Sequence, residues 1–272
     1  MNAAPMMNQT MDRLAHLAQV VNGRLAGDDA AFTGISTDTR KLQAGDLYVA
    51  LSGERFDGHE FVAQAAQQGA VGAVVERLLA GSMAQVIVPD ALRALQDYAA
   101  HWRSRFQIPV IGVTGSNGKT TTKEMLSAIL DQRGPVLATI GNLNNHIGLP
   151  LTLARLRAEH QAAVIEMGAN HAGEIALLAR IGRPTIGVIT HAGAAHLEGF
   201  GSREGVARAK GEMYAGLSDT GLAVINADDH YAGLWRTLAV HCRQLSFGIE
   251  RSADVVARQL REIVERDSGH LE

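Results

Sequence analysis

The chain is poor in several features that would assign it to a particular class of protein. A single cysteine, Cys242, among 272 residues excludes an internal disulfide framework. Its 25 basic and 28 acidic residues give a net charge of -3, so it lacks the basic character of nucleic-acid-binding proteins. It has no run of about 18 apolar residues that could cross a membrane, and its N-terminus does not resemble a signal peptide. We therefore expect a cytoplasmic protein with no nucleic-acid partner and no membrane span.

The chain does have enough apolar residues for substantial hydrophobic cores. Apolar residues make up 46% of the 272, a length and composition sufficient for two domains. The dipeptide Ile108-Pro109 is a natural boundary, because the residue before a proline disfavours helix. We predict a first domain over residues 1–106 and a second over residues 107–272.

Apolar runs alternate with helical patterns along both parts of the chain. In the first part, we predict strands at 47–51, 71–75 and 85–88, and helices within 12–22, 57–69 and 90–106. In the second part, the predicted strands are 110–113, 136–139, 162–167, 186–190 and 222–226, and the predicted helices are 119–132, 147–157, 172–181, 203–216 and 228–238. This rhythm predicts an α/β fold with a parallel sheet, whose sites lie at the C-terminal ends of its strands.

A glycine-rich turn joins the strand at 110–113 to the helix at 119–132. Its sequence is Thr114-Gly-Ser-Asn-Gly-Lys-Thr120. In such a turn the backbone N–H groups and the helix N-terminus face a phosphate, the lysine reaches the outer phosphates, and the threonine binds Mg²⁺. The usual spacing places a further glycine at the position of Val113, so only the shorter form of the motif is present. We predict a nucleotide-phosphate site, and the alternative is an ordinary turn with glycines for tight packing.

One carboxylate lies inside an apolar run. Glu166 in Ala162-Ala-Val-Ile-Glu-Met167 would be costly to bury without a partner. Mg²⁺ near the phosphate loop is the partner we favour, because its ligands are carboxylate, hydroxyl and phosphate oxygens. The alternative is a buried ion pair with an arginine or a lysine.

Two polar segments each allow two interpretations. The loop Ser36-Thr-Asp-Thr-Arg40 either holds a ribose and a phosphate or forms a turn with local side-chain bonds. Asn226, which is followed by Asp228 and Asp229, either contacts a base or ribose or helps to cap the next helix.

Two further groups of polar residues give no specific signal. His191, His196 and Glu198 do not have the spacing of a common zinc motif. Lys210 lies on the helix predicted over 203–216, where a lysine is usually a solvated charge.

Five motifs occur together and in order. They are Thr114-Gly-Ser-Asn-Gly-Lys-Thr120, Gly141-Asn-Leu-Asn-Asn-His-Ile-Gly-Leu-Pro150, Val164-Ile-Glu-Met-Gly-Ala-Asn-His171, Ala194-Ala-His-Leu-Glu-Gly-Phe-Gly201 and Ala207-Arg-Ala-Lys-Gly-Glu212. Together they resemble the Mur ligases of peptidoglycan synthesis, most closely the member that adds D-alanyl-D-alanine to UDP-N-acetylmuramoyl-tripeptide. In the first part, Ser36-Thr-Asp-Thr-Arg40, Gln43-Ala-Gly-Asp-Leu47 and Phe56-Asp-Gly-His-Glu-Phe61 resemble that family's UDP-binding domain.

The resemblance implies a small α/β domain that binds the UDP-linked substrate, followed by a P-loop ATPase domain with a parallel sheet. It also implies a reaction. ATP phosphorylates the terminal carboxylate of UDP-N-acetylmuramoyl-tripeptide, and the amine of D-alanyl-D-alanine attacks the acyl phosphate. ATP and Mg²⁺ are the expected cofactors, and the expected enzyme is a cytoplasmic monomer.

The same resemblance assigns roles to individual residues. Lys119, His196 and Lys210 are the expected catalytic residues. The expected metal ligands are Thr120, Glu166, His196 and, if carbamylated, Lys210. The expected contacts are Thr114, Gly115, Ser116, Asn117, Gly118, Lys119, Thr120 and Asn226 for the nucleotide, and Ser36, Asp38, Thr39, Arg40, Asn142, Asn144 and Asn145 for the UDP-linked peptide.

The chain departs from the family in one respect. The family has a C-terminal Rossmann-like domain, and we find no counterpart of it in the 272 residues. We therefore expect a truncated ligase that does not complete catalysis alone. The alternatives are another Mur-type or folylpolyglutamate-type amide ligase, a P-loop kinase or NTPase, and a non-catalytic binding module.

Overall fold

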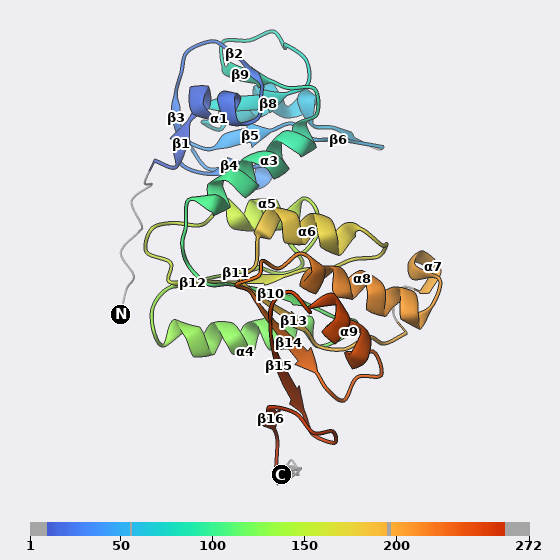
Figure 1. Cartoon of the computed structure of the whole chain (residues 1–272). Coiled ribbons are helices and arrows are strands. Elements are labelled where there is room, and N and C mark those ends of the chain that lie inside the picture. Colours follow the sequence, from blue (N-terminus) through green and yellow to red (C-terminus); the bar gives the residue numbers. More distant parts are fainter. Residues whose placement is uncertain (1–9, 55, 195–196, 259–272) are drawn as a thin grey trace, which may run out of the picture.

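The computed structural model describes residues 10–54, 56–194 and 197–258. It contains two main β-sheets, with helices between them (Figure 1). Within the described residues, no helix is long and apolar enough to cross a membrane. The predicted α/β fold class is confirmed.

The first part of the chain contains β1 (Asp12–Arg13), α1 (Leu14–Val20), β2 (Arg24–Ala26), β3 (Ala31–Phe32), β4 (Ile35–Ser36), η1 (Thr39–Lys41), β5 (Leu47–Val49), β6 (Ser52–Gly53), β7 (Phe56–Asp57), η2 (Gly58–Phe61), α2 (Val62–Gln67), β8 (Gly72–Val75), β9 (Ala84–Ile87) and α3 (Ala91–Ser104). Five of these strands form a sheet in the order β2-β9-β8-β5-β4. Only β2 runs antiparallel to its neighbour. The strands β5, β8 and β9 correspond to the three predicted strands.

The second part contains β10 (Val110–Thr114), α4 (Lys119–Asp131), β11 (Val136–Ala138), α5 (Gly148–Leu153), β12 (Ala162–Glu166), α6 (Glu174–Gly182), β13 (Ile186–Ile189), α7 (Leu197–Phe200), α8 (Arg203–Ala215), β14 (Leu222–Asn226), α9 (Ala232–Leu238), β15 (Arg243–Gly248) and β16 (Val255–Val256). Its sheet has the order β11-β12-β10-β13-β14-β15-β16, and every pair is parallel. The predicted parallel sheet is confirmed. All its carboxyl ends therefore lie along one edge, where α/β proteins place their sites.

Several elements differ from the sequence-based expectation, and three of them have a clear local cause. The helix predicted over 147–157 ends at Leu153, where the Arg157 guanidinium binds the carbonyl groups that follow the last turn. The helix predicted from residue 228 begins at Ala232, because an Asp229 side-chain oxygen accepts a main-chain N–H and forms a turn first. Strand β15 has no predicted counterpart, because most of its side chains are at least partly exposed and it lacks an apolar run.

The two faces of the parallel sheet are covered unequally. Helices α5, α6, α8 and α9 lie on the face that looks toward the first sheet, and α4 lies on the other (Figure 1). Beside α4, that second face has an apolar groove of about 720 Å³, lined by Ile111, Ile186, Val188, Val224 and Phe247 among others. Buried parallel strands require apolar side chains on both faces, which explains their continuous apolar runs.

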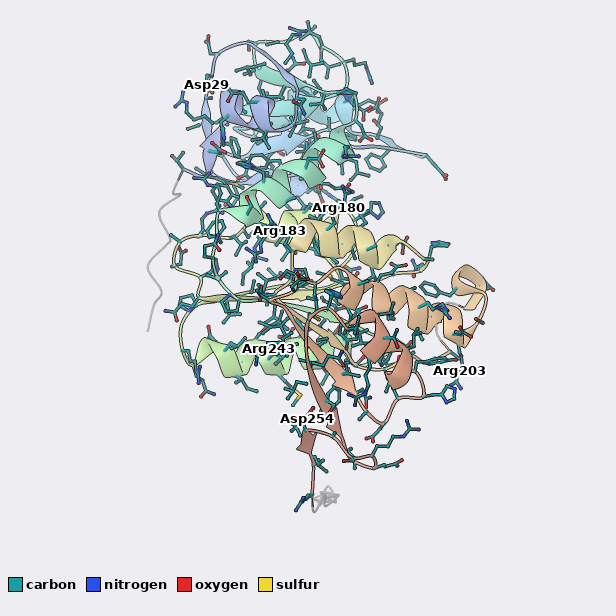
Figure 2. All side chains as sticks on the ribbon, viewed as in Figure 1. Asp29, Arg180, Arg183, Arg203, Arg243 and Asp254 are labelled. Atoms are coloured by element: carbon teal, nitrogen blue, oxygen red, sulfur yellow. The ribbon has the colours of Figure 1, made fainter. Side chains whose placement is uncertain are left out.

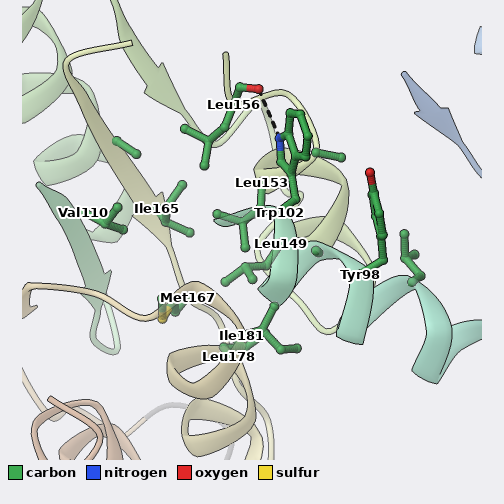
Figure 3. Packing of buried hydrophobic residues seen from close by; sticks show 14 of the residues in the cluster. Tyr98, Trp102, Val110, Leu149, Leu153, Leu156, Ile165, Met167, Leu178 and Ile181 are labelled. Atoms are coloured by element: carbon green, nitrogen blue, oxygen red, sulfur yellow. Dashed lines mark hydrogen bonds between the residues drawn. The ribbon is translucent and has the colours of Figure 1, made fainter. Parts of the chain in front are cut away.

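Helix α3 joins the two sheets through a buried aromatic cluster. Trp102 is 5% exposed, and its indole N–H donates to the carbonyl oxygen of Leu156 at 3.1 Å (Figure 3). One turn earlier on the same face of the helix, the Tyr98 ring stacks on Trp102 and its hydroxyl donates to Asp12 Oδ2 at 2.9 Å. One buried apolar cluster thus passes from the first sheet through α3 to the second. The domain boundary between residues 106 and 107 stays a prediction.

Replacing Trp102 by alanine is expected to lower the free energy of unfolding by about 3–5 kcal/mol, because it leaves a cavity in this cluster. The matched control is Arg93→Ala on the same helix, whose side chain is 61% exposed and whose loss should change stability by no more than about 0.5 kcal/mol. Denaturant unfolding of the three proteins measures the difference. A Trp102→Ala variant as stable as the control would show that α3 does not bind the two sheets into one core.

Candidate active site

The phosphate loop lies at the carboxyl end of the central strand β10. Gly115 and Gly118 have φ angles of 146° and 78°, and α4 begins immediately afterwards at Lys119. A Cβ atom on Gly115 would lie 1.9 Å from Thr190 Oγ1, so the loop passes β13 at a distance only glycine permits. The N–H groups of the first turn of α4 have no intrahelical partners and favour an anion. The predicted strand–loop–helix arrangement is present.

The Lys119 amine lies over this loop. Its Nζ donates to the carbonyl oxygens of Gly115 at 2.9 Å and of Ser116 at 3.3 Å. The loop is tied to the end of β13, because the Ser116 N–H donates to His191 O at 2.9 Å and Thr190 Oγ1 donates to Asn117 O at 2.6 Å. None of these bonds uses the side chain of Asn117, which is exposed and has its Nδ2 atom 3.5 Å from His191 Nε2.

Thr114 differs from the other predicted nucleotide contacts. Its side chain is fully buried, and its hydroxyl donates to Met167 O at 2.7 Å. This bond links the ends of β10 and β12. The Thr114 hydroxyl therefore supports the sheet and is not free to contact a ligand.

Glu166 is buried, at 3% exposed, beside the phosphate loop. Its Oε2 accepts from Thr120 Oγ1 at 2.8 Å, and its Oε1 accepts from Asn144 Nδ2 at 2.8 Å. Within the described residues, no lysine or arginine forms an ion pair with it. The buried ion pair considered as an alternative is therefore not found there.

This donor set fits Mg²⁺. A carboxylate and a hydroxyl are hard oxygen ligands, and Mg²⁺ is commonly held by one or two such groups together with phosphate oxygens and water. Within the described part of the chain, no three His, Cys, Asp or Glu residues come close enough to hold a metal by themselves. A metal here would therefore also need ligands from the nucleotide, from water or from residues outside that part. His196, the other predicted ligand, lies outside the described residues.

A pocket of about 310 Å³ opens beside these groups. It brings together predicted residues from separate motifs with six that the sequence did not single out. The lining residues are Gly115, Lys119, Asn142, Asn144, Asn145, His146, Gly168, Ala169, Asn170, Glu174, Leu178 and Lys210. Of these six, His146 lies inside the 141–150 motif, and Gly168, Ala169 and Asn170 lie inside the 164–171 motif, which is the signal that would have identified them.

Lys210 is buried in this pocket and is only 2% exposed. Its Nζ lies 3.5 Å from Ala169 O and 5.5 Å from the centre of the Phe200 ring. Burial, together with the positive charge of Lys119, lowers the pKa of Lys210 to about 8. The interpretation of Lys210 as a solvated charge is wrong. A neutral amine is the form that reacts with CO₂, so this environment favours carbamylation.

A second pocket, of about 360 Å³, lies at the ends of β13 and β14. Its lining residues are His191, Ala192, Gly193, Arg203, Asn226, Asp228, Asp229, His230 and Tyr231. One of them, Arg203, is at the start of α8 and is labelled in Figure 2.

The polar groups at the base of this second pocket bind the protein itself. Asn226 Nδ2 donates to Thr190 O at 2.8 Å, and Asp229 Oδ2 accepts from Ala192 N–H at 2.8 Å. The two Asp229 oxygens thus hold the loop after β13 and the turn before α9. The N-cap residue of α9, Tyr231, makes no side-chain capping bond, so neither Asn226 nor the two aspartates cap that helix.

The hydroxyl-rich loop at 36–40 lies in the first part and does not line either pocket. Ser36 and Thr39 are buried, and Asp38 accepts hydrogen bonds from the Arg40 N–H, Nε and Nη2 at 2.8–3.0 Å. The local turn considered from the sequence is therefore present. The Arg40 side chain is 84% exposed, and its guanidinium remains accessible to a ligand.

Comparison with known proteins gives consistent matches along the chain. A family model of the Mur ligase middle domain matches residues 113–271, and one of the Mur ligase family catalytic domain matches residues 31–105. The chain is 48% identical over 225 residues to the UDP-N-acetylmuramoyl-tripeptide--D-alanyl-D-alanine ligase of Escherichia coli, covering 83% of this chain and 50% of that protein. The enzyme of the same name from Bacillus subtilis is 39% identical over 260 residues, covering 93% and 55%.

Solved structures agree with these matches. MurF from Acinetobacter baumannii superposes with a TM-score of 0.86 at 41% identity, covering 91% of this chain and 55% of that one. The MurF ligase from Thermotoga maritima in complex with ADP gives 0.73 at 35% identity, covering 80% and 51%. The chain spans about half the length of the curated relatives it matches.

Raising the pH is expected to stabilise the unaltered chain relative to a Lys210→Met variant. The pKa of Lys210 falls from 10.5 to about 8 on folding, so between these values the unfolded chain holds a proton that the folded chain has lost. The free energy of unfolding therefore rises with pH in that window. Urea unfolding at about pH 7 and about pH 10, in buffers freed of CO₂, measures this. A difference between the two proteins that does not change with pH would contradict it.

Proposed function

The chain belongs to the Mur ligase family, and from this premise we propose that it carries the UDP-substrate and nucleotide sites of an ATP-dependent ligase. The proposed reaction joins D-alanyl-D-alanine to UDP-N-acetylmuramoyl-tripeptide, the activity that the names of its relatives state. The observation that carries the proposal is the contact of buried Glu166 with Thr120 and Asn144, beside a phosphate loop and a pocket containing two lysines. We also propose that the protein is cytoplasmic and monomeric.

In this proposal the phosphates of ATP lie on the loop 115–118 and the N-terminus of α4. Lys119 would turn from the loop carbonyls to the transferring phosphate. Thr120 and Glu166 would hold Mg²⁺, with His196 as a further proposed ligand. Mg²⁺, when bound, neutralises charge on the phosphate oxygens. The base and ribose occupy the second pocket, beside Asn226.

The 310 Å³ pocket would receive the terminal carboxylate of the UDP-linked peptide. Asn142, Asn144 and Asn145 line it from one loop. Asn144 Nδ2 is bound to Glu166 and Asn145 Oδ1 to the start of α5, so the Asn142 amide, Asn144 Oδ1 and Asn145 Nδ2 would orient a peptide. The carboxylate oxygen attacks the γ-phosphorus and ADP leaves. The amine then attacks the acyl carbon, loses a proton, and phosphate departs. Lys119 and, once carbamylated, Lys210 with its metal would stabilise charge while the protein positions the reactants.

The UDP end of the substrate would lie over the first part of the chain. Arg40 is paired with Asp38 in an exposed bond that costs little to exchange for a diphosphate. A second turn nearby in sequence is held rigidly. His59 is buried, its Nδ1 lies 2.6 Å from Asp57 Oδ1, and its Nε2 accepts from Glu76 N–H at 2.8 Å. Family membership favours this ligase over the P-loop kinase considered from the sequence.

The first test is calorimetric titration of the chain with UDP-N-acetylmuramoyl-tripeptide. We expect saturable binding, weakened about tenfold or more by Arg40→Ala, because a hydrogen bond to a charged group contributes about 1.5–3 kcal/mol. The control is Arg93→Ala, an exposed arginine on α3. Equal affinity in Arg40→Ala and the control would remove the loop at 36–40 from the site. Absence of binding in a folded chain would overturn the ligase proposal.

The second test is titration with ADP and Mg²⁺. Lys119→Ala is expected to weaken ADP binding about tenfold, since it removes the cation over the phosphate loop. Lys41→Ala, at an exposed lysine in the first part, is the control. If both variants bound ADP as the unaltered chain does, the phosphates would not lie on this loop.

A further inference from the structure

A second lysine of α4, Lys123, is buried and has no part in the proposed reaction. It is 2% exposed, and its Nζ donates to the carbonyl oxygen of Thr139 at 2.9 Å. Its carboxylate partner, Glu124, is 66% exposed, so the ion pair reaches the surface from only one side. A buried ammonium is costly, and an apolar side chain of similar length would fill the space more cheaply. The bond to Thr139 therefore requires an explanation beyond packing.

Thr139 directly follows β11 and precedes the asparagine-rich loop at 141–147. It is 1% exposed, and all of its polar groups are engaged. Its N–H donates to Val164 O at 3.2 Å, its Oγ1 accepts from Glu166 N–H at 2.9 Å, and its carbonyl accepts from Lys123. Thr139 thus links Lys123 on α4 to the main-chain N–H of Glu166.

These bonds close a ring around the proposed metal ligands. Glu166 is held at its main chain by Thr139 and at its carboxylate by Thr120. Thr120 and Lys123 are three residues apart on α4 and so lie on one face of the helix. Asn144 adds a further contact from outside the ring, because its Nδ2 donates to Glu166 Oε1. Every member of the ring is fixed by a partner from another element.

We infer that Lys123 is a positioning residue for the Mg²⁺ site. By binding Thr139 it fixes the end of β11, and through Thr139 it fixes the direction in which the Glu166 carboxylate meets Thr120. This inference rests on the metal site of the proposed function. Groups that orient metal ligands in this way typically change metal affinity about 10–100-fold when they are removed.

The test compares ADP affinity with and without Mg²⁺ in the whole chain, by calorimetry in a Mg²⁺ series and in EDTA. Lys123→Met keeps the length of the side chain and removes the donor. We expect it to weaken Mg²⁺ binding about tenfold and to leave ADP affinity in EDTA unchanged. The matched control is Glu124→Gln, which removes the exposed partner of Lys123 but keeps the bond to Thr139. It should retain the response to Mg²⁺.

A second pair of variants tests the other half of the connection. Thr139→Val removes the acceptor for the Glu166 N–H and is expected to reproduce the loss seen in Lys123→Met. Thr139→Ser keeps the hydroxyl and is expected to restore the Mg²⁺ response. Thermal melting of each variant identifies any that fails to fold, and the Thr139 pair then decides the question if Lys123→Met is that variant.

The outcomes separate the inference from the proposed function. If Lys123→Met and Thr139→Val fold and respond to Mg²⁺ as the unaltered chain does, Lys123 has only a structural role and the inference is overturned. The same conclusion follows if these variants lose as much ADP affinity in EDTA as they lose in the presence of Mg²⁺, each compared with the unaltered chain. If ADP binding by the unaltered chain is indifferent to Mg²⁺, the metal site itself is wrong, and the inference falls with it.

Discussion

The burial of one ionisable side chain in an apolar strand is the constraint on which the second part of the structure depends. Glu166 ends a strand whose residues are all buried. Its carboxylate must therefore find polar partners within the fold. It finds them on α4 and on the asparagine-rich loop. Because Glu166 must have hydrogen-bond partners, the start of α4, the loop at 141–147 and the end of β11 lie next to one another around it.

The electrostatics of the pocket follow from the same geometry. Lys119 and Lys210 line one cavity, and the charge of Lys119 adds to burial in lowering the pKa of Lys210. Two amines beside each other favour an anionic occupant, or the conversion of one amine to an anionic group. The proposed phosphate transfer would place anionic groups in this cavity, and the proposed carbamylation would convert Lys210 to an anion, so both are compatible with the local charge balance.

Helix α3 connects this pocket to the first part of the chain. Gln96 is 7% exposed, and its amide donates to His146 O at 3.1 Å within the asparagine-rich loop. Arg157 reaches back to Thr33 O at 2.6 Å. A substrate extended from the loop at 36–40 to the phosphate loop would thus be held by two parts that share one buried cluster. The packing of α3 sets the geometry between its two ends.

The sequence by itself determined the parallel sheet, the phosphate loop and the presence of a costly carboxylate at Glu166, because periodicity, glycine spacing and a charge within an apolar run are local signals. It also carried, through its motifs, the resemblance to the family. The tertiary structure decided which side chains meet. Lys210 looks like a solvated charge on its helix and Thr114 like a nucleotide contact, and no local pattern distinguishes Lys123. Their burial and partners depend on segments up to 53 residues away in the chain, and no local pattern encodes such contacts.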